Sequence, residues 1–147
     1  MKIIVINGPN LQLLGKRKPE VYGSETLEGL QKRLEDVGRE LKTKISFFQS
    51  NSEGEIVDII GSSVKNEVDG IIINPAAYTH TSVAIHDALE SVDVPAIEVH
   101  ISNIHRREEF RRKSMTAPAC IGQISGLGTD GYEWALRAMA GHLKKQT

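Results

Sequence analysis

The chain is poor in cysteine and has no long apolar run. Cys120 is its single cysteine, so no internal disulfide can form, and this usage fits a reducing compartment. The apolar run Ile3–Ile6 is too short for the core of a signal peptide and far too short for a membrane span. These absences predict a cytoplasmic protein with no membrane partner.

Neither sign of charge prevails. The 18 Lys and Arg residues are opposed by 19 Asp and Glu, which leaves a net charge of −1 and no overall attraction to nucleic acid. The 39% hydrophobic and 25% charged residues are ordinary values for a soluble globular protein. A length of 147 residues suits one compact domain. We therefore predict a single domain over residues 1–147 and no nucleic-acid partner.

Short apolar runs rich in β-branched residues recur along the chain. They are nearly continuous rather than alternating, which is typical of strands buried on both faces of a parallel sheet. The runs are Ile3–Ile6, Ile45–Phe48, Ile71–Ile73, Ala96–Val99 and Ala119–Ile124.

Amphipathic helical patterns lie between these runs. Apolar residues repeat at spacings of three and four from Leu27 to Leu41, with Thr26 placed to cap the helix. Ser52 and Glu55 form the pattern of a capping box. Further helices are expected over Val83–Val92, over His105–Lys113, and from Tyr132 to Leu143 after a cap at Thr129. The alternation predicts an α/β, flavodoxin-like three-layer sandwich around a five-stranded parallel sheet of order 2-1-3-4-5.

Polar residues follow the strands at the edge where such a sheet binds ligands. Asn10, Asn74, His80, His100 and Ser102 come after the first, third and fourth runs, which are neighbours in this order. They should therefore converge on one cleft beyond the carboxyl ends of the strands. Each alone also suits a turn or a helix cap, but two imidazoles beside two amides favour acid–base chemistry.

Other patterns point away from common chemistries. The G-x-G-x-x-G match at Gly126–Gly131 is followed by neither a second strand nor the expected acid, so we interpret it as a tight strand-to-helix turn. His100 and His105 lack partners at ligand spacing, which predicts no metal site. Cys120 lies in an apolar run and is expected to be a core residue rather than a nucleophile. In the charged segment after His105, one arginine is expected to turn inward toward an oxygen-rich ligand.

Four sequence blocks together resemble the type II 3-dehydroquinate dehydratases. The blocks are NGPNLQLLGKRKPEVYG at 7–23, NPAAYTHTSVAIHDA at 74–88, EVHISNIHRREEFRR at 98–112 and GQISGLGTDGY at 122–132. The resemblance implies a flavodoxin-like lyase of the shikimate pathway, which leads to chorismate and the aromatic amino acids. The implied reaction is anti elimination of water from 3-dehydroquinate through an enolate to give 3-dehydroshikimate, without metal or cofactor. It also implies a homo-oligomer, a dodecamer built from trimers, in which Asp87 reaches the site of a neighbouring subunit.

The resemblance also implies a role for each catalytic residue. Tyr22 is the base that removes the proton alpha to the ketone, and Arg17 holds that tyrosine as phenolate. Asn10 orders a water against the enolate oxygen. His100 protonates the departing hydroxyl, and Glu98 orients His100.

Substrate binding falls, on the same resemblance, to a second group of residues. Asn74 and the backbone of Ile101 and Ser102 hold the substrate carboxylate. His80 and Arg111 bind the ring hydroxyls.

The loop at about 15–24 carries both Arg17 and Tyr22 and is expected to be a mobile lid. Free tyrosine has a pKa near 10, about three units too high for a base at neutral pH, and a nearby guanidinium lowers an acid's pKa by about one to three units. Arg17 alone is therefore barely sufficient. Lys18 and Ala76 stand where the family usually has Glu and Gly.

Two alternatives to an enzyme remain open on the residues alone. A non-catalytic flavodoxin-like module that binds a small anion or a nucleotide would use the glycine-rich turn at Gly126–Gly131. A receiver-type signalling domain fits less well, because the first run ends in Asn7-Gly8-Pro9-Asn10 without an acidic pocket.

Overall fold

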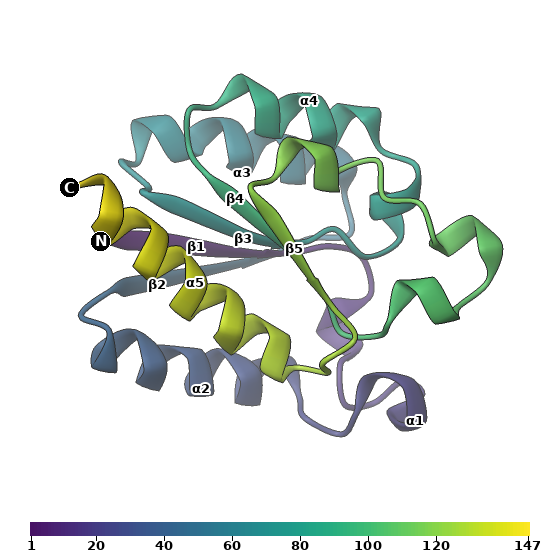
Figure 1. Cartoon of the computed structure of the whole chain (residues 1–147). Helices are drawn as coiled ribbons and strands as arrows, with labels where there is room; N and C mark the ends of the chain where they lie inside the picture. The colour runs from purple at the N-terminus through teal and green to yellow at the C-terminus, as the bar shows by residue number, and fades with distance from the viewer.

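The computed structural model describes the chain from Met1 to Thr147 apart from the side chain of Tyr22. Its centre is a five-stranded, all-parallel sheet of order β2-β1-β3-β4-β5 (Figure 1). The predicted topology is thus confirmed. The strands are β1 (Lys2–Asn7), β2 (Lys44–Gln49), β3 (Gly70–Asn74), β4 (Ala96–His100) and β5 (Gly122–Ser125).

Helices cover both faces of the sheet and complete three layers (Figure 1). The helices α2 (Leu27–Glu40) and α5 (Asp130–Gln146) pack on one face, and α3 (Glu53–Lys65) and α4 (Val83–Ser91) pack on the other. The short α1 (Pro19–Tyr22) lies in the 15–24 loop. None of the helices among the described residues is long and apolar enough to cross a membrane.

The core is divided by the pleat of the strands. Ile3 and Val5 of β1 pack against α2 and α5, whereas Ile4 and Ile6 pack against α3 and α4. Successive side chains of a strand point to opposite faces, so a run that is apolar at every position is buried on both. This is why continuous apolar runs, and not alternating ones, marked the strands of this chain.

All three predicted cap residues stand at the start of a helix. The hydroxyls of Thr26 and Ser52 accept hydrogen bonds from the third backbone N–H that follows each of them, at 3.1 and 3.3 Å. The carboxylate of Glu55 accepts from the hydroxyl of Ser50 instead of closing the capping box. Thr129 is the N-cap residue of α5, but its hydroxyl makes no capping bond and accepts from Arg33 at 3.0 Å.

Two further expectations are corrected by the structure. The fifth strand begins at Gly122 rather than Ala119, because Ala117–Ala119 forms a 3-10 turn that contains Pro118, and proline has no N–H to give to a strand ladder. The segment expected to be one helix over His105–Lys113 forms two 3-10 turns. Its single large apolar residue, Phe110, is 66% exposed, so no apolar face holds a longer helix against the sheet.

Candidate active site

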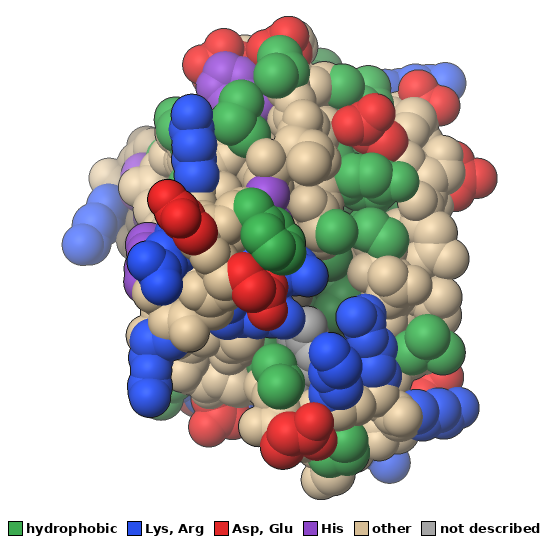
Figure 2. All heavy atoms as spheres, turned by 90° about the vertical axis from the view of Figure 1, so that its right-hand side faces the viewer, with side chains coloured by type: hydrophobic (Ala, Val, Ile, Leu, Met, Phe, Trp, Pro, Cys, Tyr) green, Lys and Arg blue, Asp and Glu red, His purple; other side chains and the backbone are tan. Residues whose placement is uncertain are grey.

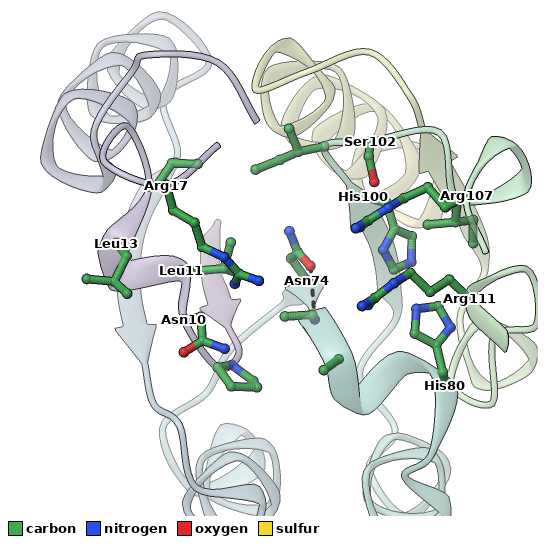
Figure 3. A pocket seen from close by; sticks show the side chains of 16 residues that line it. Asn10, Leu11, Leu13, Arg17, Asn74, His80, His100, Ser102, Arg107 and Arg111 are labelled. Atoms are coloured by element: carbon green, nitrogen blue, oxygen red, sulfur yellow. Dashed lines mark hydrogen bonds between the residues drawn. The ribbon is translucent and has the colours of Figure 1, made fainter. Parts of the chain in front are cut away.

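A pocket of about 270 Å³ opens where β1, β3 and β4 end. The carboxyl ends of these strands are held level by the parallel register, which pairs Asn7 with Asn74 and Ile73 with Glu98. Eight of the predicted site residues line the pocket (Figure 3). They are Asn10, Arg17, Asn74, His80, His100, Ile101, Ser102 and Arg111. The convergence expected from the topology is therefore present.

The chain after β1 passes very close to the chain after β3. A Cβ at Gly8 would lie 2.4 Å from the carbonyl oxygen of Pro75, so only glycine allows this approach. Asn10 then adopts the left-handed conformation, with φ of 71°, which asparagine tolerates better than most residues. Its backbone N–H donates to Asn51 Oδ1 at 3.0 Å. The turn thereby presents the Asn10 side chain at the rim of the pocket.

His100 is anchored from behind by a carboxylate that is wholly buried. Its Nε2 lies 2.9 Å from Oε2 of Glu98, which has no exposed surface. The same carboxylate accepts from Ser114 Oγ at 2.8 Å, from Gln123 Nε2 at 2.7 Å and from the hydroxyl of Thr116. Glu98 therefore has four protein donors and does not itself line the pocket.

Those donors keep Glu98 charged. Burial by itself raises the pKa of Glu98, but hydrogen bonds from His100 and Thr116, the charge of His100 and a further bond from Gln123 outweigh it, so the pKa of Glu98 lies below its ordinary value. A carboxylate accepts hydrogen bonds and donates none, so Nε2 of His100 carries a proton. The other ring nitrogen, Nδ1, is left to serve the pocket.

His80 carries its proton on the other ring nitrogen, Nδ1. Its Nδ1 lies 2.8 Å from the carbonyl oxygen of Lys113, which makes Nδ1 the donor. Burial, together with the positive charges of His100 and Arg111, lowers the pKa of His80 below its ordinary value. A neutral ring with its proton on Nδ1 offers Nε2 as an acceptor, which suits a hydroxyl donor on a ligand.

Three guanidinium groups surround the pocket. Arg17 extends from one side, and Arg107 and Arg111 extend from the other (Figure 3). Arg111 is fixed by Glu108, whose Oε2 lies 2.5 Å from its Nε, and by the ring of Phe110 at 4.8 Å. The right-hand side of Figure 1, seen face-on in Figure 2, carries several Lys and Arg side chains. The pocket is thus suited to an anion.

Sequence reasoning missed Arg107. It predicted that one arginine of the charged segment turns inward, whereas two do. The spacing of four between Arg107 and Arg111 would have indicated both only on a continuous helix. Two 3-10 turns, rather than one helix, bring these side chains to the same wall.

The deciding comparison is with known protein families. A family model described as dehydroquinase class II matches residues 1–140. The chain belongs to this family. A 3-dehydroquinate dehydratase of Clostridium perfringens strain 13 is 55% identical over 146 residues, which cover 99% of this chain and all of the relative. One of Endomicrobium trichonymphae is 60% identical over 138 residues, or 94% of this chain and 96% of the relative.

Solved structures agree with this assignment. The type II dehydroquinase of Butyrivibrio crossotus superposes with a TM-score of 0.93 at 49% identity, over 95% of this chain and 97% of that one. The enzyme of Propionibacterium acnes gives 0.91 at 44% identity, over 95% and 96%. The resemblance found in the four sequence blocks is therefore confirmed.

Asp87, predicted to bind substrate, is not among the residues that line this pocket of the class II dehydroquinase. Tyr22, predicted to be the base, has a side chain outside the described residues. Asp87 is exposed on α4, with Oδ1 3.1 Å from His86 Nδ1. Together with Glu90, these two residues form a group of donor atoms within 4.8 Å of one another, and none of the three lines the pocket.

Cys120 and the glycine-rich turn have structural surroundings. Cys120 precedes β5 rather than lying in a strand, but it packs against the core between the sheet and α3 and α4. Burial, and next the charge of Glu98, raise the pKa of its thiol to about 12, which makes it a poor nucleophile. Gly126 and Gly128 have φ of 92° and 62° and form the turn into α5.

Proposed function

We propose that this pocket is where the class II dehydroquinase chain, a hydro-lyase of the shikimate pathway, removes water from 3-dehydroquinate to give 3-dehydroshikimate. The observation that carries the proposal is the His100–Glu98 pair, with Nε2 2.9 Å from the carboxylate and Nδ1 left for the pocket. A charged carboxylate behind the ring stabilises an imidazolium, and an imidazolium is the acid that loss of a hydroxyl group needs at neutral pH.

The first step is proton abstraction by Tyr22. The phenolate oxygen takes the proton alpha to the ketone, and the electrons of the broken C–H bond move to the ketone oxygen to form an enolate. Stabilising a phenolate near pH 7 needs about 4 kcal/mol, since free tyrosine titrates about three units higher. Arg17 supplies part of this, and the guanidinium groups of Arg107 and Arg111 across the same pocket add to the positive field.

The second step is loss of the hydroxyl group. A water ordered by Asn10 donates to the enolate oxygen, and its prior placement lowers the energy of the developing charge. The enolate then re-forms the ketone, the carbon–carbon double bond forms, and the carbon–oxygen bond breaks. Nδ1 of His100 gives its proton to the leaving group, which departs as water. Tyr22 is then protonated and His100 neutral, and both return to their starting states through solvent.

Substrate binding uses the other lining residues. The Asn74 side chain and the backbone N–H groups of Ile101 and Ser102 hold the carboxylate of 3-dehydroquinate. His80 accepts from a ring hydroxyl through Nε2, and Arg111 donates to one. The role of His80 is supported by its unprotonated Nε2, which can accept from a hydroxyl.

Three wider features belong to the same proposal. The 15–24 loop of the single catalytic domain acts as a lid that closes over bound substrate. The chain assembles into trimers and then a dodecamer, in which the exposed Asp87 reaches a neighbouring subunit's pocket. The enzyme works in the cytoplasm without metal or cofactor. The alternative of a non-catalytic binding module is not favoured, because relatives that match nearly the whole chain are named 3-dehydroquinate dehydratases.

The test is a direct assay with the purified protein. The protein is treated with EDTA and mixed with 3-dehydroquinate, and the ultraviolet absorbance of the conjugated enone carboxylate is followed. We expect sustained turnover that EDTA does not change. Treatment with borohydride in the presence of substrate should leave the activity intact, since no lysine imine forms. Absence of product, or inactivation by borohydride, would contradict the proposal.

A further inference from the structure

A buried chain of three hydrogen-bonded side chains lies beneath the pocket. Asn74 donates from Nδ2 to the Tyr132 hydroxyl at 2.9 Å, and that hydroxyl donates to Asn7 Oδ1 at 2.6 Å. The three residues are 3%, 0% and 1% exposed, respectively, for Asn74, Tyr132 and Asn7. They come from β3, α5 and β1, so this series of hydrogen bonds links the pocket to α5.

The direction of this chain is set by a backbone N–H. The Oδ1 of Asn74 accepts from the N–H of Ala76 at 3.0 Å (Figure 3). If the amide of Asn74 were flipped, its NH₂ group would face the Ala76 N–H, and two donors would oppose each other. The amide nitrogen of Asn74 must therefore face Tyr132, and the Tyr132 hydroxyl must accept from it and donate onward to Asn7.

At its Asn7 end, this series of hydrogen bonds leaves one atom without a partner among the described residues. Nδ2 of Asn7 is buried without a hydrogen-bond acceptor among the described residues. Reversing every bond would satisfy this atom but would turn the Asn74 amide nitrogen toward Ala76. Burial also raises the pKa of Tyr132, which keeps its hydroxyl protonated and able to donate.

We propose that Tyr132 is a positioning residue for substrate binding, which fixes the Asn74 amide so that one N–H points into the pocket. The inference rests on the proposed function and deepens it. One hydrogen of Nδ2 is used on Tyr132, so the second N–H of Asn74 is left for a ligand. This N–H suits an oxygen acceptor, such as the carboxylate of 3-dehydroquinate.

The decisive variant is Tyr132→Phe, which keeps the aromatic ring in the core and removes the hydroxyl. We expect KM for 3-dehydroquinate to rise about 5- to 10-fold, the range of one lost hydrogen bond, with kcat within about 3-fold of wild type. A rise in KM with kcat retained indicates a binding contact that was made equally in the ground state and the transition state. Tyr78→Phe is the matched control, because the Tyr78 hydroxyl bonds to the Asn51 carbonyl at 2.7 Å and Tyr78 does not line the pocket.

A double-mutant cycle separates positioning from general stability. If Tyr132 acts through Asn74, adding Tyr132→Phe to Asn74→Ala leaves KM unchanged within about 2-fold. The same KM increase in both backgrounds, or a wild-type KM for Tyr132→Phe, overturns the inference.

If Tyr132→Phe does not fold, Asn7→Ala provides the test: it removes the acceptor of the hydroxyl, and we expect KM to rise about 2- to 4-fold. A wild-type KM for that variant then overturns the inference. Turnover of 3-dehydroquinate by the wild-type protein tests the proposed function separately. If the wild-type protein does not turn over, the proposed function is rejected, independently of the results for the variants.

Discussion

Replacing Glu98 by Gln is the perturbation that best separates the charge of the buried carboxylate from its packing. Gln has the same shape and remains an acceptor at one position. The hydroxyl of Thr116, which bonds to Oε1, can rotate to accept from the new NH₂ group. Because His100 and Gln123 both donate to Oε2, the amide oxygen takes that position, and each N–H exchanges a bond to a charged acceptor for a bond to a neutral one.

The magnitude follows from those two bonds. A hydrogen bond to a charged group contributes about 1.5–3 kcal/mol and a neutral one about 0.5–1.5 kcal/mol, so two of them cost about 2 kcal/mol. A neutral amide is easier to bury than a carboxylate, which reduces the net loss to about 1–2 kcal/mol. For a chain of this size, that lowers Tm by roughly 2–8 °C.

Activity should fall much further than stability. Without the charge of Glu98, the imidazolium of His100 loses its partner, and we expect kcat to fall roughly 10- to 100-fold, part of what a general acid contributes. KM should change little, because Glu98 does not line the pocket. Thr116→Val is the control: it removes one bond to Glu98 and leaves the charge, so we expect a similar loss of Tm with kcat near wild type. A wild-type kcat for Glu98→Gln, or an equal loss of kcat in both variants, would refute a role for the charge of Glu98.

Three further predictions rest on charged groups. Because folding lowers the pKa of Glu98, the charged carboxylate adds stability that is fully present above its unfolded pKa of about 4.3. This stability is lost as pH falls through the lower folded pKa. In thermal melts across pH, the Tm advantage of wild type over Glu98→Gln should therefore shrink below about pH 4. Folding also lowers the pKa of His80, so in the folded enzyme the ring stays neutral to somewhat below the ordinary value of about 6.5. KM should therefore change little just below neutral pH and rise as pH falls toward 5. A KM that rises equally in His80→Ala would refute this. Arg33 binds both oxygens of Glu25, at 2.9 and 3.1 Å, just after the lid loop. Since the pair is only partly buried, Arg33→Leu should cost about 1 kcal/mol of stability and lower kcat several-fold. An unchanged Tm and kcat would count against a lid that is anchored by this ion pair.

The strand order and the position of the pocket were predictable from sequence because both follow from burial. A strand such as β3, with Ile71 and Ile73 on one face and Ile72 on the other, has no polar position before Asn74 at its end, and such strands form the middle of a parallel sheet. Once the order is set, the residues after β1, β3 and β4 must meet. Asn10, Asn74 and His100 were found in this way.

The supporting contacts were not predictable, because they join residues far apart in sequence. Asn74 and Tyr132 are separated by 58 positions, and Asn7 and Tyr132 by 125. No local periodicity marks a hydroxyl in α5 as the partner of an amide in β3. The donors to Glu98 from Ser114 and Gln123 likewise depend on a turn and a strand start that apolar patterning placed wrongly.

The proposed reaction depends most on Tyr22 as the base that acts in the same pocket as His100. The most direct measurement is the initial rate of enone formation from 3-dehydroquinate by wild type and by Tyr22→Phe, with substrate affinity measured in parallel by calorimetry. We predict that Tyr22→Phe binds 3-dehydroquinate with near wild-type affinity and that its kcat falls at least about 100-fold. A Tyr22→Phe variant that turns over at the wild-type rate would contradict this prediction.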